Sequence, residues 1–226
     1  MGVHPKESRG RPQTSSVFIA LWLLHKRPIL EKQPTPAATL HNYIIIMKEV
    51  HTMQCGDYTY RAIDTGAEIM EYYGQGGEIT LPEMLDDLPV VSVGLCAFIM
   101  RTDLTAVTLP KTLRHIGGSA FEGCSALTSI TLNDGLETIE YRAFASCTAL
   151  REIAFPDSVT AVGGAVLSGC TALNSVHLPN ALTVLPMQAL MNCTSLEFLN
   201  LPDTLTRIDH EALRGCTHLT ALAIPA

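Results

Sequence analysis

Leu127-Thr128-Ser129-Ile130-Thr131-Leu132 is the stretch that decides the fold, because its pattern returns every 23 residues. The equivalent stretches are Leu104–Leu109, Leu150–Phe155, Leu173–Leu178, Leu196–Leu201 and Leu219–Ile224. A fixed period of this size is typical of a solenoid, in which each repeat is one coil stacked on the previous one. Apolar residues at alternate positions predict a short strand with one buried face. The sequence therefore predicts a repeat solenoid of about six coils from residue 81 to the end.

Further positions recur around this strand in each coil. A proline follows it in most coils, where its missing N–H is harmless at a strand end, and Asn133 is the exception. A second apolar pair comes next, such as Leu113 and Ile116, and an Ala-Phe-x-Gly-Cys segment closes the coil. We expect one tight helical turn there. Five cysteines mark it, Cys124, Cys147, Cys170, Cys193 and Cys216, and Arg101 stands in their place one coil earlier. Three glycines supply backbone freedom, namely Gly123, Gly169 and Gly215.

These motifs resemble those of the BspA-type leucine-rich repeat family, which is found especially in bacterial surface proteins. The residues that carry the resemblance are the Leu-x-x-Ile-x-Leu-Pro strand, the second Leu-x-x-Ile, the Ala-Phe pair and the Gly-Cys step. The resemblance covers about residues 81–226 and implies a leucine-rich repeat β-solenoid. It also implies adhesion or protein binding, and this step is an analogy because such folds host many partners.

The segment before the repeats looks like the entry hairpin of the same family. Its two halves are Asp57–Asp64 and Ala67–Tyr73, and a Thr65-Gly66 turn between two strand-like runs favours a hairpin independently. We therefore divide the chain into a non-repeat extension (1–46), an N-terminal β-hairpin cap (47–80) and a leucine-rich repeat solenoid (81–226).

The charge of the chain is uneven. Residues 1–48 hold seven Lys/Arg and two Asp/Glu, a formal charge of +5, so the remaining eight Lys/Arg and twenty Asp/Glu give −12. Nucleic acid binding depends on neutralising phosphates with Lys and Arg. So acidic a repeat region excludes nucleic acid as its partner.

Residues 1–46 share nothing with the repeats. Their longest apolar run is Val17–Leu24, and eight residues are too few for a membrane span, which needs about 20. The segment fits a disordered or upstream extension with Met47 as the natural start, a targeting signal, or a folded cap. The expected cellular location depends on this interpretation. The protein is at the cell surface or secreted if the family role holds, and it is cytoplasmic if the chain starts at Met47.

The cysteine column has three interpretations. A zinc site needs close pairs that converge tetrahedrally, whereas thiols one coil apart point in parallel along a line. Disulfides fit the spacing, because strands about 4.8 Å apart bring Cα atoms within the permitted range, but side chains in register point the same way and five is an odd number. We expect small, buried, reduced thiols that fill the turn, and no metal or other cofactor.

No catalytic set is evident in the sequence. His115, His177, His210 and His218 fall at four different coil positions. Acyl transfer would require a nucleophile, a base and an orienting group on one face. We therefore expect a protein that is not an enzyme and has no catalytic residues.

The outward positions of the repeated strand form stacked columns, in which any binding function is to be sought. The end coils offer Thr, Ser and Ala there, whereas the middle coils vary. The predicted binding residues are Arg151, Glu152, Asn174, His177, Glu197, Phe198 and Asn200. Because aromatic anchors dominate interface energetics, the exposed Phe198 suggests a patch for a protein or glycan partner. The alternative is a purely structural repeat module of a larger surface assembly.

The chain ends at Ala226, directly after the strand at Leu219–Ile224. An open coil leaves unpaired strand groups and apolar surface. A homodimer through this coil is one expectation, and a fragment of a longer repeat array is the other.

Overall fold

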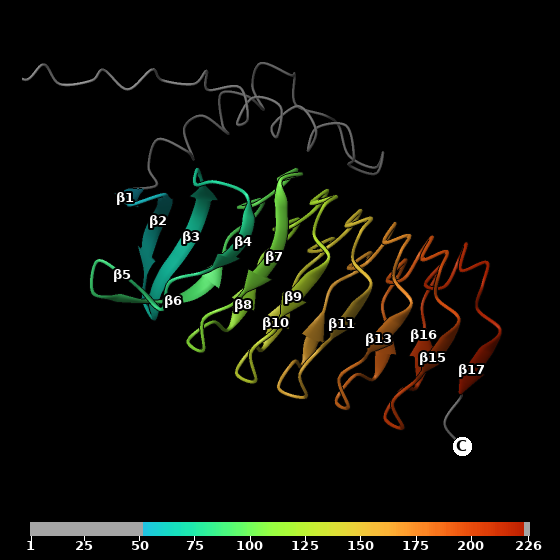
Figure 1. The fold of residues 1–226 in the computed structure, drawn as a ribbon. Helices are drawn as coiled ribbons and strands as arrows, with labels where there is room; N and C mark the ends of the chain where they lie inside the picture. The colour runs from blue at the N-terminus through green and yellow to red at the C-terminus, as the bar shows by residue number, and fades with distance from the viewer. Residues whose placement is uncertain (1–51, 224–226) are drawn as a thin grey trace, which may run out of the picture. The chain divides into compact units, whose positions relative to one another are not determined.

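The computed structural model describes residues 52–223, which form a β-solenoid with seventeen strands and no helix in that range. The stack of coils runs from the hairpin at its beginning to β17 at its end (Figure 1). It has about seven turns, so the predicted solenoid is confirmed with one turn more than the repeated stretches suggest. The expectations for residues 1–46 and for the chain end at Ala226 lie outside the described residues, and the domain boundaries stay predictions.

The first ladder consists of the strands that the repeated stretch predicts. Its members are β4 (Gly77–Thr80), β7 (Leu104–Thr108), β9 (Ser129–Thr131), β11 (Glu152–Ala154), β13 (Ser175–His177), β15 (Phe198–Asn200) and β17 (Ala221–Ala223). Pairing is parallel and offset by one repeat, so that Ile130 lies opposite Val107 and Val176 opposite Ile153. It divides the ladder into the sheets β4-β7-β9, β11-β13 and β15-β17, which are in contact without paired strands between them. The seventh strand is β4, which pairs in parallel with β7 although it lacks the full leucine pattern.

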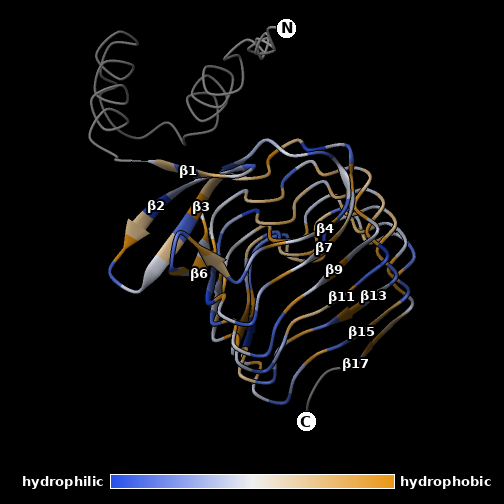
Figure 2. Cartoon of the chain, turned by 60° about the vertical axis from the view of Figure 1, so that its left-hand side comes forward, coloured by the Kyte–Doolittle hydropathy of each residue, from blue (hydrophilic) through white to orange (hydrophobic). Residues whose placement is uncertain are grey.

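A second ladder, which the sequence analysis missed, runs along another side of the stack. Its members are β6 (Leu88–Val93), β8 (His115–Ile116), β10 (Thr138–Ile139), β12 (Ala161–Val162), β14 (Val184–Leu185) and β16 (Arg207–Ile208). Most are two residues long and therefore too short to show an alternating pattern. Viewed along the stack, the coils lie one behind another around a shared interior (Figure 2).

The entry hairpin is confirmed. β2 (Tyr58–Ile63) pairs antiparallel with β3 (Gly66–Tyr72), and the turn is at residues 64–65, one position before the predicted one. β1 (Met53–Cys55) extends the hairpin, and β3 continues it into the second ladder through β6. Gly66 has φ of 154°, and a Cβ there would lie 2.3 Å from the Pro89 carbonyl oxygen. Only glycine therefore lets the hairpin approach the next strand so closely. β5 (Met84–Leu85) forms a small antiparallel pair with β6.

The segment that closes each coil is a series of turns, so the prediction of a helical turn is wrong. In one coil the amide of Cys124 donates to Phe121 at 3.2 Å, whereas the amides of Phe121 and Gly123 donate to Ala143 and Ala145 of the next coil, both at 2.8 Å. Alternate amides thus bond within a coil and between coils. A helix would direct all of them along its own axis, which stacking at one strand spacing does not allow.

An aromatic column fills the interior at the start of the stack. Phe98, Phe121 and Phe144 are fully buried, with ring centroids 4.9 and 5.6 Å apart and planes within 13° of parallel. Tyr72 of the hairpin continues the column, 5.4 Å from Phe98. Hairpin and coils therefore share one hydrophobic core.

Asn133, the exception to the repeated proline, makes a hydrogen bond that a hydroxyl group makes in three other coils. Hydroxyl groups two residues after the proline position donate to the carbonyl of the previous coil: Thr112 to Val90, Ser158 to Leu136 and Thr204 to Leu182. Gly135 occupies this position in the coil of Asn133 and has no side chain to donate. The side-chain amide of Asn133 donates to the Leu113 carbonyl instead, at 2.9 Å. Its buried Oδ1 is left without a partner.

Candidate interaction surface

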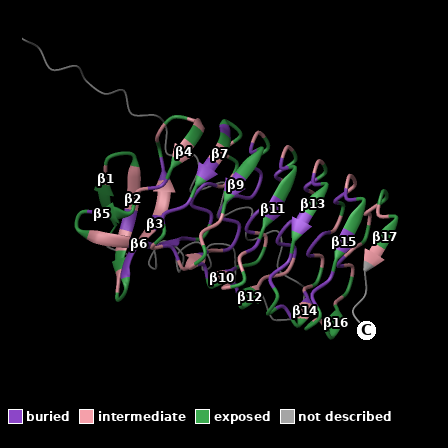
Figure 3. Ribbon diagram, turned by 60° about the horizontal axis from the view of Figure 1, so that its bottom comes forward, coloured by how far each residue is buried: buried purple, intermediate pink, exposed green. Residues whose placement is uncertain are grey.

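The first ladder presents its side chains alternately inward and outward. In β9, β11, β13 and β15 the central residue is buried and both flanking residues are exposed. Figure 3 shows these exposed segments repeating from coil to coil. Parallel pairing in register places Glu152 opposite Ser175 and Ala154 opposite His177. Outward residues of paired strands therefore stand in line along the stack.

All seven predicted binding residues are exposed on this ladder or directly before its strands. They come from three neighbouring coils, and β13 lies between β11 and β15 (Figure 1). Phe198 is 54% exposed, although it lies opposite Ala221 of the next coil. That exposure is high for a phenylalanine, a residue type usually buried. The structure thus brings these residues to one face, and their role in binding stays a prediction.

The polar side chains of this face are free to meet a partner. Within residues 52–223, the carboxylates of Glu152 and Glu197 and the guanidinium of Arg151 form no ion pair or side-chain hydrogen bond. Some charges elsewhere are paired, as where the Arg142 guanidinium binds the buried carboxylate of Glu122. A partner would therefore not have to break ion pairs to reach the charged groups on the face.

A hollow of about 390 Å³ lies over β9, β11 and β13, and the sequence analysis did not foresee it. Its outward lining consists of short side chains, Ser129, Thr131, Ala154 and Ser175, with the longer Glu152 and His177 beside them. Leu132, which is half-buried, contributes apolar surface, and the buried Ile130 and Ile153 line the hollow with their backbone. In the sequence, the feature that corresponds to this hollow is a group of small residues at outward strand positions next to the larger Glu152 and His177.

Another hollow, of about 320 Å³, lies against the second ladder. Its one charged lining residue is Asp209, and Arg207 already pairs with that carboxylate at 2.6 Å. This hollow therefore offers a partner no free charge.

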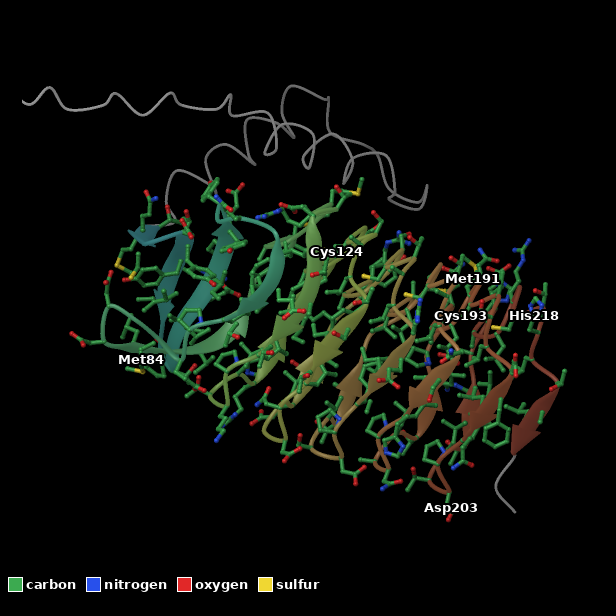
Figure 4. All side chains as sticks on the ribbon, in the orientation of Figure 1. Met84, Cys124, Met191, Cys193, Asp203 and His218 are labelled. Carbon is green, nitrogen blue, oxygen red and sulfur yellow. The ribbon has the colours of Figure 1, made fainter. Side chains whose placement is uncertain are left out.

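The cysteine column lies away from the outward face of the first ladder, and its thiols are buried, with Cys216 half-buried. Cys124 and Cys193 are at the upper edge in Figure 4, whereas Asp203 is at the lower one. Each of the five thiols donates to a carbonyl 26 residues earlier, at 3.1 to 3.3 Å. Burial raises the pKa of the Cys124 and Cys170 thiols to about 12. Thiolates are the reactive form, so these side chains serve as packed donors. All seven cysteines of the chain are free thiols in the structure.

The four histidines within residues 52–223 do not converge on a site. His115 contacts the Thr138 hydroxyl at 2.8 Å on the second ladder, and His218 contacts the Thr194 carbonyl. Residues 52–223 contain no group of three side chains placed to bind a metal ion. In the same range, no helix is long and apolar enough to cross a membrane.

Comparison with known proteins supports the architecture. A family model described as "BspA type Leucine rich repeat region" matches residues 91–220 in six copies. The structure is similar to that of a leucine rich repeat protein from T. pallidum, with 34% identity and a TM-score of 0.73 over 77% of this chain and 83% of that one. Nothing among the curated proteins matches.

Two further solved structures are similar over 76% of this chain, each with a TM-score of 0.59. One is a leucine-rich repeat protein from Bacteroides ovatus, at 25% identity and 53% coverage of that chain. The other is described as a leucine rich cell surface protein from Faecalibacterium prausnitzii, at 26% identity and 54% coverage of that chain.

Proposed function

Because this chain belongs to the BspA-type leucine-rich repeat family, we propose that it is a non-catalytic interaction module that binds a protein through the exposed face of its first ladder. The family supports a protein-interaction or structural repeat module, and its members are generally not enzymes. The observation that carries the finer proposal is the exposed ring of Phe198 among free polar side chains on three neighbouring coils. Aromatic residues of this kind anchor protein interfaces.

An adhesive role at a cell surface is the further part of this proposal. It is supported by the similar Faecalibacterium prausnitzii structure, which is described as a cell surface protein. A purely structural module within a larger surface assembly is the alternative, and it predicts that changes on the first ladder leave binding unaffected. A glycan partner and a homodimer stay predictions from the sequence.

The test compares two double variants of the full chain. Arg151→Ala/Phe198→Ala removes a cation and the exposed ring from the first ladder. The matched control, Arg207→Ala/Ile208→Ala, removes a cation and an apolar side chain that is 43% exposed from the second ladder. Proteins that the immobilised chain retains from bacterial and host-cell extracts are quantified by mass spectrometry.

We expect a set of proteins that the wild type and the control variant retain and the first-ladder variant loses. Thermal unfolding must show that both variants remain folded. Identical sets for all three forms would contradict the proposal and favour the structural alternative.

A further inference from the structure

The hollow over β9, β11 and β13 has a chemical character that the proposed function does not specify. Its shape follows from the sequence in register, because Glu152 lies opposite the short Ser175 and His177 opposite the short Ala154. Ser129 and Thr131 of β9 continue the low region on one side. Two long side chains thus stand at diagonal corners of a patch that is otherwise made of small ones.

The floor and the rim differ in polarity. Half-buried Leu132 and exposed Ala154 give the hollow hydrocarbon surface, the buried Ile130 and Ile153 contribute backbone, and hydroxyl groups and the Glu152 carboxylate stand at its edge. An aliphatic stem with a polar end fits this combination, as in the side chains of lysine and arginine, which bury their methylene groups and keep the charged head in water.

The charge of the face points to a cation. Glu152 is exposed and forms no ion pair or side-chain hydrogen bond within residues 52–223. Glu78 and Glu197 on the same ladder are exposed and free in the same way. Arg151 is the one free cation on or directly before the strands of this ladder in the described part of the chain. Unpaired negative charge on an interaction face selects partners of the opposite sign.

We propose that this hollow is a subsite for a basic side chain, arginine or lysine, of a protein partner, with Glu152 as its counter-ion. The inference rests on the proposed function and adds the chemical class of the partner residue. The stem lies against Ala154 and Leu132, and the cationic head meets the Glu152 carboxylate. Phe198, two strands further along the ladder, provides the separate apolar anchor.

The test uses the full ¹⁵N-labelled chain and a minimal probe, Nα-acetyl-arginine-N-methylamide. Nα-acetyl-citrulline-N-methylamide has the same shape without the charge and serves as its control. We expect saturable shifts of amide signals in β9, β11 and β13 with the arginine probe and much smaller ones with citrulline. Equal shifts with both probes, or shifts confined to other strands, would overturn the proposal.

Two matched substitutions assign the counter-ion. Glu152→Gln should weaken probe binding about two- to fivefold, the effect of one exposed ion pair. Glu197→Gln, on the same face but outside the lining of the hollow, should leave the dissociation constant unchanged. An unchanged constant in Glu152→Gln would refute the assignment.

The extract experiment separates this inference from the proposed function. Glu152→Gln should reduce retention of the same proteins that Arg151→Ala/Phe198→Ala loses. If the double variant loses these proteins and Glu152→Gln retains them fully, the result supports the proposed interaction face and refutes the proposed basic subsite. If neither variant loses any protein, the proposed interaction face itself is refuted.

Discussion

At the scale of single residues, the most regular feature is a left-handed backbone at two positions in every coil. The first set comprises Cys96, Ser119, Arg142, Ala165, Gln188 and Glu211, with φ from 52° to 60°. The second comprises Met100, Gly123, Ser146, Gly169, Asn192 and Gly215, with φ from 57° to 79°. Hydrogen bonds between coils impose this conformation whichever residue is present, although it costs an L-residue about 1–2 kcal/mol.

The second set allows a paired test of this strain. Ser146→Gly should raise the free energy of unfolding by about 0.5 kcal/mol, because the relieved left-handed strain exceeds the extra backbone entropy of glycine in the unfolded chain. Gly169→Ala, one coil later, should lower it by at least as much, since its Cβ would also lie 3.3 Å from the Ser146 Oγ. Urea unfolding of both variants measures the effect, and a less stable Ser146→Gly would contradict it.

At the scale of elements, Arg101 explains how the hairpin joins the coils. The cysteines at its coil position donate one bond to the preceding coil, but the element before Arg101 is the hairpin. Its guanidinium donates to the carbonyls of Tyr72 and Gly74, at 2.9 and 2.8 Å, and lies 4.9 Å from the centre of the Tyr72 ring. Asp103 binds the same guanidinium and raises its pKa, so the charge is permanent. The longer side chain of Arg101 therefore replaces the cysteine thiol as hydrogen-bond donor where the preceding element is the hairpin and not a coil.

Removing this link should loosen the hairpin selectively. Arg101→Ala leaves two carbonyls without charged donors, and we expect a loss of about 2–3 kcal/mol. Hydrogen exchange should lose protection in β2 and β3 while β13 and β15 retain theirs. The control Arg207→Ala breaks an exposed pair with Asp209, which is worth about 0–1 kcal/mol. Uniform loss of protection along the whole stack would show that Arg101 has no special role at the junction.

At the scale of the whole molecule, the buried thiols act together on stability. Burial raises the pKa of Cys96 to about 11 and of Cys124 and Cys170 to about 12, and Cys147, Cys193 and Cys216 shift in the same direction. In the unfolded chain thiols ionise near pH 8.5. Above that pH the unfolded state binds fewer protons than the folded one, so stability falls as the pH rises.

The expected result is a steep loss of stability in alkali. Each buried thiol contributes up to about 1.4 kcal/mol per pH unit between its unfolded and folded pKa values. Cys147→Ser removes one such group and should make the slope shallower by about that amount. Urea unfolding at pH 8, 9 and 10 measures both slopes with the cysteines kept reduced, and parallel lines for wild type and variant would refute the expectation.

Much of the fold could be predicted because the same sequence pattern recurs in each of several coils. The leucine positions of the first ladder and the hairpin before it are local patterns, and both are confirmed. The turns could not be predicted, because the amides of Phe121 and Gly123 bond to the next coil and no local pattern reports such bonds. The second ladder was missed for a related reason, since its two-residue strands form only through stacking.

The candidate surface, too, could be predicted from the sequence only in part. The sequence alone determined the 23-residue period, and the period identified which side chains stand in the outward columns, because a strand alternates its faces wherever it packs. Only the tertiary structure decided what those columns form: that Glu152 and His177 stand diagonally around small side chains, and that the charges on this face are free. These properties depend on contacts between residues of different coils. Periodicity gives the position of a residue within its coil, whereas stacking decides what that residue touches.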